Sequence, residues 1–274
     1  MKVRIREFLR EDIGSGDITS ELVVPADARA EGHIICKADC VLAGLAEASE
    51  LFAELGAEVV KSKTDGKPAK KGEVVMEVRG TARKVLAGER LALNLIMRMS
   101  GIATLTHELV HRCWEVNPKV RIAATRKTTP GFREFEKKAV LLGGGDPHRY
   151  GLYDAILIKD NHIRIAGGVV EALKRARKGS FTKKIEIEVE SREDALLALD
   201  NGADIIMLDN FRPAEFTKLS GELRKKRPDV LIEASGGITP DNVVEYAKGA
   251  DIISLGWLTH SARSIDFSMD VEKA

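Results

Sequence analysis

Six short, apolar, strand-like runs alternate with helical segments through the second half of the chain, and this rhythm limits the possible folds more than any other feature. The expected strands lie near residues 120–126, 154–159, 184–190, 204–209, 230–235 and 251–256. The expected helices lie near residues 132–142, 167–178, 192–201, 213–227 and 240–249. Strands that alternate with helices over short connections become parallel neighbours, and a set of this size can close or nearly close into a barrel. The fold class is therefore α/β.

The residues before this alternation mix strands and helices without a regular order, which predicts a separate α+β sandwich. Residues 33–38 and 72–80 are strand-like, and residues 46–56 form an amphipathic helix that ends at Gly56. A long helical pattern begins near Thr81, and Ser100-Gly101 is expected to bend or split it.

Near the end of the sequence, apolar and polar residues alternate over 265–271. This pattern predicts a half-buried strand, which we expect to pair with the sheet of the first domain. The expected organisation is a sandwich domain over residues 1–105, a barrel domain over 106–260, and the returning strand within 261–274.

Composition argues against two classes of partner. The chain has 43 Lys and Arg residues against 42 Asp and Glu residues, whereas a general nucleic-acid surface needs a basic excess. No apolar run approaches the length of a membrane span, and acidic residues follow the first apolar residues directly, unlike a signal peptide. We therefore expect a cytoplasmic protein without nucleic-acid or membrane partners.

The cysteines Cys36, Cys40 and Cys113 show no metal-type pairing and are expected to be buried free thiols. Glutamine is absent, while Lys, Arg and Glu are abundant, which favours a thermophilic source. A melting temperature in the ordinary mesophilic range of about 45–65 °C would contradict that hypothesis.

Basic side chains gather where the first two of the alternating strands end. Arg126 and Lys127 follow the first strand, Lys159 follows the second, and His148 and Arg149 lie in the connection between them. The carboxyl ends of parallel strands share one rim, where such folds bind their ligands. These groups therefore predict a site for a strongly anionic ligand, although each one taken singly is more simply a solvated surface charge.

Acidic side chains are expected to point into the same rim. Glutamates alternate with apolar residues along residues 185–190, and the outer face of a barrel strand must be apolar to pack on helices. Glu186, Glu188 and Glu190 should therefore point inward, and the same alternation directs Met207 and Asp209 inward. Buried carboxylates are costly without cations, so acids and bases are predicted to share one wet cavity. An edge strand with its glutamates in solvent is the alternative.

Two later turns are suited to binding phosphate. Ser235-Gly236-Gly237 follows one strand and precedes a helix, and Gly256 ends the next strand. Glycines let backbone N–H groups approach a phosphate, as in barrels that bind phosphate after their last two strands, although glycine turns also end strands for steric reasons alone. Together with inward carboxylates, these turns suggest a phosphosugar substrate with Mg²⁺.

Motifs spread over nearly the whole chain resemble those of the quinolinate phosphoribosyltransferase family. In chain order they are EDIGSGDITS, GERLALNLIMRMSGIAT, ATRKTTPG, GGGDPHRYGLYD, LIKDNH, EVE, MLDN, EASGGIT and ISLGWLTHS. The resemblance implies a pentosyltransferase of NAD biosynthesis, which joins phosphoribosyl pyrophosphate to quinolinate with decarboxylation and releases nicotinate mononucleotide, pyrophosphate and CO₂. It also implies an N-terminal α/β sandwich, an incomplete, open parallel α/β barrel, and homodimers with shared active sites that can assemble further into a hexamer.

The resemblance assigns roles to single residues as well. Quinolinate would be held by Arg126, His148, Arg149 and Lys159, with Arg90 supplied by the neighbouring subunit. Phosphoribosyl pyrophosphate would be met by Lys127, Glu188 and Asp209, of which the two acids would also hold Mg²⁺. The catalytic set would be Lys127, Lys159, Glu188 and Asp209. The 5′-phosphate would lie on Ser235, Gly236, Gly237 and Gly256.

Two positions depart from the family pattern. Pro147 stands where many members carry asparagine, and Trp257 replaces a small residue. Because proline fixes its own φ and restricts the residue before it, the loop could aim His148 differently. The alternatives are a paralogue associated with molybdenum transport, a Schiff-base aldolase that uses Lys159, and a non-catalytic sensor of pyridine carboxylates.

Overall fold

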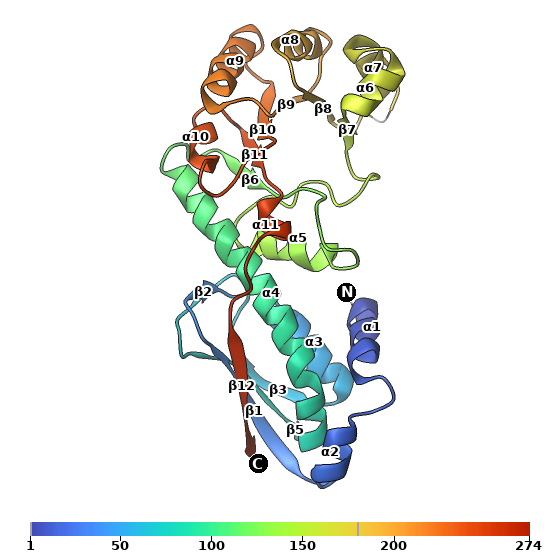
Figure 1. Ribbon diagram of the computed structural model, residues 1–274, viewed down its shortest axis with the longest axis vertical. Helices are drawn as coiled ribbons and strands as arrows, with labels where there is room; N and C mark the ends of the chain where they lie inside the picture. The colour runs from blue at the N-terminus through green and yellow to red at the C-terminus, as the bar shows by residue number, and fades with distance from the viewer. Residues whose placement is uncertain (1, 180) are drawn as a thin grey trace. The chain divides into compact units, whose positions relative to one another are not determined.

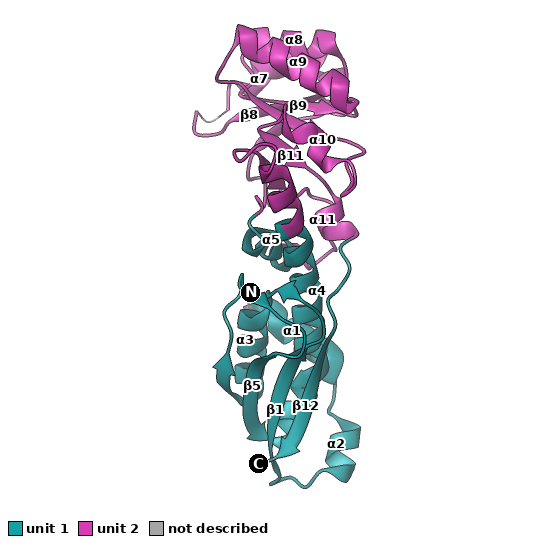
Figure 2. Cartoon of the chain, turned by 90° about the vertical axis from the view of Figure 1, so that its left-hand side faces the viewer, with its two compact units in different colours: residues 1–107, 134–144, 262–274 teal, residues 108–133, 145–261 magenta. Residues whose placement is uncertain are grey.

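The computed structural model of the chain describes residues 2–179 and 181–274. The chain divides into two compact units (Figure 2). Unit 1 comprises Met1–His107, Glu134–Gly144 and Ala262–Ala274, and unit 2 comprises Glu108–Arg133 and Gly145–Ser261. The segment 134–144, which the sequence ranges placed with the barrel, therefore groups with unit 1.

Unit 1 is built on a four-stranded antiparallel sheet in the order β12-β1-β5-β3 (Figure 1). The strands are β1 (Arg29–Cys36), β3 (Glu58–Ser62), β5 (Val74–Thr81) and β12 (Phe267–Lys273), and a separate two-stranded sheet joins β2 (Cys40–Val41) to β4 (Pro68–Ala69). Along β1, every second residue is buried, as expected for a strand with one face on a core. The C-terminal strand pairs with β1 from Ala30↔Lys273 to Cys36↔Phe267.

The helices of unit 1 include α1 (Lys2–Ile13), α2 (Ile18–Val23), α3 (Leu45–Leu55) and α5 (Arg133–Leu142). Helix α3 begins after Gly44 and ends at Gly56, whose φ of 76° lets its N–H return to the carbonyls of Phe52 and Ala53. Leu51 and Phe52 lie fully buried in the core. Among the described residues, none of the helices combines the length and apolar character needed to cross a membrane.

Helix α4 (Ala82–Trp114) is one continuous helix, so it is not split at Ser100-Gly101. These two residues serve close packing instead. A Cβ on Gly101 would lie 2.0 Å from the carbonyl oxygen of Arg263. The Ser100 hydroxyl accepts the Ala43 N–H at 3.0 Å and donates to the Ala43 carbonyl at 3.1 Å.

Unit 2 contains a parallel sheet in the order β6-β11-β10-β9-β8-β7 (Figure 1). The strands are β6 (Arg121–Ala123), β7 (Ile156–Ile158), β8 (Ile185–Val189), β9 (Ile205–Asp209), β10 (Leu231–Ser235) and β11 (Ile252–Ser254). Within the described ranges, β6 and β7 stand at the two ends of this order, so the barrel is open. Its helices are α6 (Asp160–Ala166), α7 (Val169–Ala176), α8 (Arg192–Asp200), α9 (Pro213–Lys226), α10 (Val243–Ala247) and α11 (Trp257–His260).

The helix expected over 167–178 is present as α7, and a helix that was not expected, α6, precedes it. Gly167 and Gly168 have φ values of 94° and 123°, which end α6 and separate it from α7. Helix α6 therefore begins directly after Lys159, at the carboxyl end of β7. The first parallel strand is shorter than expected. Strand β6 pairs with β11 only as far as Ala123, so residues 124–126 are not part of it.

Candidate active site

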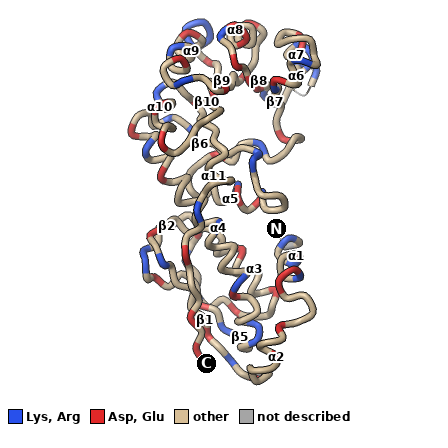
Figure 3. Tube along the Cα trace, in the orientation of Figure 1, with Lys and Arg blue, Asp and Glu red and all other residues tan. Residues whose placement is uncertain are grey.

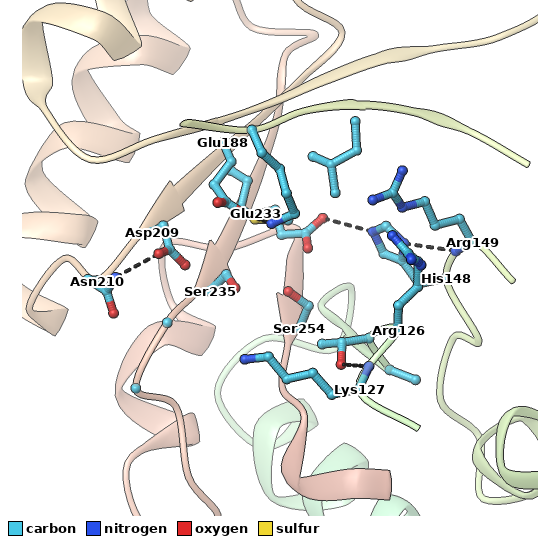
Figure 4. A pocket seen from close by; sticks show the side chains of 17 residues that line it. Arg126, Lys127, His148, Arg149, Glu188, Asp209, Asn210, Glu233, Ser235 and Ser254 are labelled. Atoms are coloured by element: carbon cyan, nitrogen blue, oxygen red, sulfur yellow. Dashed lines mark hydrogen bonds and ion pairs between the residues drawn. The ribbon is translucent and has the colours of Figure 1, made fainter. Parts of the chain in front are cut away.

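A pocket of about 380 Å³ lies at the carboxyl ends of the parallel strands, and every residue that lines it belongs to unit 2 (Figure 4). Its walls mix cations, carboxylates, glycines and a few apolar side chains. The lining residues are Ala124, Thr125, Arg126, Lys127, His148, Arg149, Leu157, Lys159, Glu188, Met207, Asp209, Asn210, Glu233, Ser235, Gly236, Gly237 and Ser254. Away from this pocket, acidic and basic residues are interspersed along the trace, in keeping with the balanced charge (Figure 3).

The basic residues singled out from the sequence meet in this pocket. Arg126 and Lys127 are exposed in the loop after β6, whereas Arg149 is buried with 8% of its surface accessible. Burial is the main reason why the pKa of Arg149 is lowered, and the nearby charge of Arg126 acts in the same direction. Two guanidinium groups held so close repel each other, so an anion placed between them would gain from both.

The carboxylates at the ends of β8 and β9 contact neighbouring polar side chains. Lys159, after β7, forms an ion pair with Glu188 on β8. On β9, Asp209 accepts a hydrogen bond of 2.6 Å from the side-chain amide of Asn210. Glu188 and Asp209 therefore both present carboxylate oxygens to the pocket, and neither is fully buried.

Two buried acids face the ring of His148. Glu186 on β8 and Glu233 on β10 are 3% and 0% exposed, and each has a carboxylate oxygen 3.5 Å from Nε2 of His148. Burial, followed by the adjacent charge of Glu233, raises the pKa of Glu186 to about 8. Both oxygens of Glu233 and Oε1 of Glu186 are buried and have no hydrogen-bond partner among the described residues. Together the three side chains bring potential metal-ligating atoms within 4.8 Å of one another.

The loop that carries His148 is tied to the first strand of the sheet. Asp146 donates its N–H to the Ile122 carbonyl at 2.8 Å and forms a parallel bridge with Ala123. Its carboxylate accepts the His148 N–H at 2.7 Å. His148 itself has a φ of 51°, an unusual value for a residue with a side chain. The backbone and carboxylate of Asp146 thus hold the turn after Pro147 against the first strand of the sheet.

The glycine turn after β10 forms one wall of the pocket. Gly236 and Gly237 have φ values of 80° and 61°, and a Cβ on Gly236 would lie 2.5 Å from the backbone nitrogen of Asn210. The turn therefore requires glycine at Gly236, both for its backbone conformation and for this close approach. Ser235, at the end of β10, lines the same wall.

Gly256 lies beside the pocket-lining Lys127. A Cβ at Gly256 would be 3.0 Å from Cδ of Lys127 and 2.7 Å from the ring of His260. Thr259, one turn further on, donates its hydroxyl hydrogen to the Lys127 carbonyl at 2.7 Å. This glycine thus lets α11 pack closely against the loop that presents Lys127.

One residue of the expected set belongs to the other unit. Arg90 is exposed on the part of α4 that lies in unit 1, whereas the pocket is built from unit 2. Glu233 and Asn210 are among the pocket residues that the sequence analysis did not single out. Glu233 shares a strand face with Ser235, so strict alternation along β10 could have found it. Asn210 has a φ of 61° after the end of β9, and spacing alone gave no signal for it.

Comparison with known proteins gives a consistent result over nearly the whole chain. The family model described as the quinolinate phosphoribosyl transferase C-terminal domain matches residues 102–270, and its N-terminal counterpart matches residues 17–100. The chain is 51% identical to a probable nicotinate-nucleotide pyrophosphorylase [carboxylating] of Archaeoglobus fulgidus, over 93% of this chain and 98% of the relative. It is 38% identical to the nicotinate-nucleotide pyrophosphorylase [carboxylating] of Homo sapiens, over 97% of this chain and 89% of the relative.

Solved structures agree with the sequence relatives. The structure of NadC from Streptococcus pyogenes superimposes with a TM-score of 0.92 at 36% identity, covering 98% of this chain and 95% of that one. The nicotinate-nucleotide pyrophosphorylase from Francisella tularensis gives a TM-score of 0.92 at 36% identity, covering 99% of this chain and 95% of that one.

Proposed function

The chain belongs to the quinolinate phosphoribosyltransferase family, and we propose on this premise that the pocket of unit 2 is its active site. The reaction transfers the phosphoribosyl group of phosphoribosyl pyrophosphate to quinolinate with decarboxylation, giving nicotinate mononucleotide, pyrophosphate and CO₂. The observation that carries the assignment is the meeting of Arg126, Arg149 and Lys159 with Glu188 and Asp209 in one pocket. The cations of such a site suit two anionic substrates. Its carboxylates suit phosphoribosyl pyrophosphate, whose ribose centre becomes cationic and whose diphosphate binds Mg²⁺.

Quinolinate carries two adjacent carboxylates, and the cations of the pocket are suited to them. Arg126, Arg149 and Lys159 supply the positive charge, and His148 supplies a neighbouring ring. Arginine is the better partner for a planar carboxylate because its guanidinium can donate two parallel hydrogen bonds. Arg90 would add a further cation from a neighbouring subunit, and its exposed position on α4 leaves it available for that role.

Phosphoribosyl pyrophosphate would occupy the opposite wall. Lys127 is exposed there, and the turn at Ser235, Gly236 and Gly237 brings backbone close to the space without an intervening side chain. Gly256 would complete the 5′-phosphate site through the backbone that precedes α11.

The pocket contains donors that suit Mg²⁺. Glu188 and Asp209 offer carboxylate oxygens from adjacent strands, and Mg²⁺ is typically held by one or two carboxylates together with substrate phosphates and water. When bound there with the diphosphate, the ion would offset the charge of the leaving pyrophosphate. The two acids would hold the ion, and Lys127 would add positive charge on the protein side.

The chemistry then depends on orientation and charge. As pyrophosphate leaves, the ribose centre becomes oxocarbenium-like beside Glu188 and Asp209, which stabilise it electrostatically. The pyridine nitrogen of quinolinate attacks this centre and becomes cationic, and so stabilises the carbanion that remains when the adjacent carboxylate departs as CO₂. A proton from solvent then takes the place of the lost carboxylate and gives nicotinate mononucleotide. The protein holds two mutually repelling anions in reacting positions, which is itself a large part of catalysis.

We also propose a homodimer with shared sites, which could assemble further into a hexamer. The support is the family resemblance and the exposure of Arg90 in unit 1. A cytoplasmic location is favoured by the free thiols Cys36, Cys40 and Cys113, since reducing compartments keep thiols unpaired.

One assay tests the assignment directly. The protein is incubated with quinolinate, phosphoribosyl pyrophosphate and Mg²⁺, and nicotinate mononucleotide and pyrophosphate are measured, with chelation of Mg²⁺ as a control. Nicotinate, which lacks the second carboxylate, serves as the matched poor substrate. Binding of quinolinate without pyrophosphate release would indicate a sensor instead. A covalent adduct at Lys159, trapped by borohydride with a carbonyl substrate, would indicate an aldolase.

A further inference from the structure

His148 lies between a fixed backbone turn and two buried carboxylates, and this arrangement determines which of its ring nitrogens carries a proton. The N–H of Arg149 donates a hydrogen bond of 2.8 Å to Nδ1 of His148. A nitrogen that accepts a hydrogen bond has its lone pair free and holds no proton. The ring hydrogen therefore belongs on Nε2, and the imidazole is neutral.

The protonated nitrogen faces the floor of the pocket. Nε2 lies 3.5 Å from an oxygen of Glu186 and 3.5 Å from an oxygen of Glu233. Figure 4 shows the side chain of Glu233 facing the ring of His148. These distances are longer than a good hydrogen bond, yet both acids are almost fully buried and Glu233 has no hydrogen-bond partner on either oxygen. An N–H directed at such oxygens is strongly favoured over any orientation that turns it away.

The same geometry argues against a metal ion in this group. A histidine that ligates a metal through Nε2 normally donates its Nδ1–H to another group. Here Nδ1 faces the hydrogen of the Arg149 amide, so a proton on Nδ1 would meet another proton. Three side chains with ligand atoms within 4.8 Å of one another thus do not suit a metal unless the ring turns over.

We propose that Glu186 and Glu233 are positioning residues for His148, which hold its Nε2–H against the pocket floor and fix the ring, while the Arg149 N–H donated to Nδ1 keeps the imidazole neutral. His148 then shapes the quinolinate site as a rigid ring, and the positive charge that meets the substrate comes from Arg126, Arg149 and Lys159. This assignment rests on the proposed function for the identity of the substrate, but the state of the ring does not depend on it.

The ring state is measured on the full-length protein without substrates, by ¹⁵N NMR of protein labelled at histidine, with the signals of His148 assigned from a His148→Asn variant. At pH 7.5 we expect Nε2 to show the signal of a protonated nitrogen and Nδ1 that of an unprotonated one. Two protonated nitrogens, or a proton on Nδ1, would overturn the proposal. Zn²⁺ added in slight excess should leave these signals in place, and their displacement by the metal would also overturn it.

Variants of Glu233 test the positioning role. Glu233→Gln keeps an oxygen that can face Nε2–H, so the His148 signals should stay close to those of the wild type. Glu233→Leu removes it, and the signals should move toward a mixture of ring states, while the KM for quinolinate rises about tenfold, the loss expected from about one hydrogen bond. The KM for phosphoribosyl pyrophosphate should not change. His148 signals in Glu233→Leu that match the wild type would contradict the proposal, whatever the activity.

The two possible failures are distinguishable. If the wild-type protein turns over quinolinate but its His148 is doubly protonated, the positioning inference fails and the function stands. If the ring state is as expected and no turnover is found with quinolinate, the function fails and the inference about the ring stands.

Discussion

Lys159 forms an ion pair with Glu188 across the carboxyl ends of two adjacent strands, β7 and β8. The side chain of Lys159 is 41% exposed, whereas that of Glu188 is 13% exposed, so the pair stands at the wall of the pocket with the lysine toward the open side. Under the proposed function, an incoming anion would bind this ammonium group, and the oxygens of Glu188 would face the ribose centre or Mg²⁺. The ion pair holds both groups at the wall of the pocket.

Replacing this lysine is expected to remove most of the activity. For Lys159→Ala we expect a loss of about 2–4 kcal/mol of transition-state stabilisation, which lowers kcat/KM by about 30- to 1000-fold. The change takes one cation from the quinolinate site and leaves Glu188 without its partner. Steady-state kinetics with quinolinate as the varied substrate measures the loss. Lys225→Ala, at an exposed position on α9, is the matched control, and near wild-type turnover in Lys159→Ala would contradict the site assignment.

The stability of unit 2 should depend on pH through Glu186. Burial raises the pKa of this carboxyl on folding to about 8, so its protonated form is favoured in the folded state. A group of this kind contributes its full stability below its unfolded pKa of about 4.3, and the contribution is lost as pH rises through the folded value. Glu186→Gln, which is always neutral, should therefore lose less stability than the wild type between about pH 5 and 9.

Denaturant unfolding of both proteins at several pH values in that interval measures the difference. The exposed Glu190, which directly follows the end of β8, provides the control, since Glu190→Gln should follow the wild type. Parallel curves for the wild type and Glu186→Gln would show that Glu186 ionises in the folded protein as it does in the unfolded chain.

The thiols of the native protein should be unreactive. Burial raises the pKa of Cys113 to about 11. Burial, together with a hydrogen bond to Cys36, raises the pKa of Cys40 to about 12. Because the thiolate is the reactive form, iodoacetamide at pH 8 should leave all three cysteines unmodified until the protein is denatured. Mass spectrometry counts the added groups, and rapid labelling of Cys113 in the folded protein would contradict its burial.

Two glycine substitutions in helices should have opposite effects. Gly101→Ala places a methyl group 2.0 Å from the Arg263 carbonyl oxygen, so the packing around α4 must shift and stability should fall by about 1–3 kcal/mol. Gly221→Ala in α9 meets nothing within 4 Å, so it should raise stability by about 0.4–1 kcal/mol. Thermal unfolding of both variants gives the comparison. Equal stability of Gly101→Ala and wild type would mean that the segment at Arg263 does not rest on α4.

Strong local signals made the larger elements predictable from the sequence. The six parallel strands were found because each is a short apolar run bounded by turn residues, and alternation along β8 correctly turned Glu186 and Glu188 inward. The same expectation is wrong for Glu190, which follows the end of β8 and is exposed. Strands β2 and β4 were missed because each has two residues, too few to show a period. Helix α6 was missed because it has only seven residues between the strand β7 and the glycine pair 167–168, too few to show a clear helical period.

The remaining errors arose where tertiary packing outweighs local preference. Ser100-Gly101 has a weak preference for helix, yet it lies within 33 helical residues whose packing keeps the helix continuous. Glu233 is the single charged residue in an otherwise largely apolar strand, so the local sequence does not mark it as a site residue. Its contact with His148 exists only because the fold brings β8, β10 and the His148 loop together. Arg90 shows the same limit, because its expected role depends on a second subunit and no spacing along one chain can reveal it.

The pairing of β12 with β1 also bears on how the protein is made. Strand β1 leaves the ribosome early, but its edge partner at Phe267–Lys273 is translated after the whole of unit 2. Throughout that interval the antiparallel sheet has a bare edge of unpaired N–H and C=O groups, the kind of surface that recruits strands from other nascent chains. Unit 2 can therefore fold first, whereas the four-stranded sheet of unit 1 is complete only after β12 has been translated.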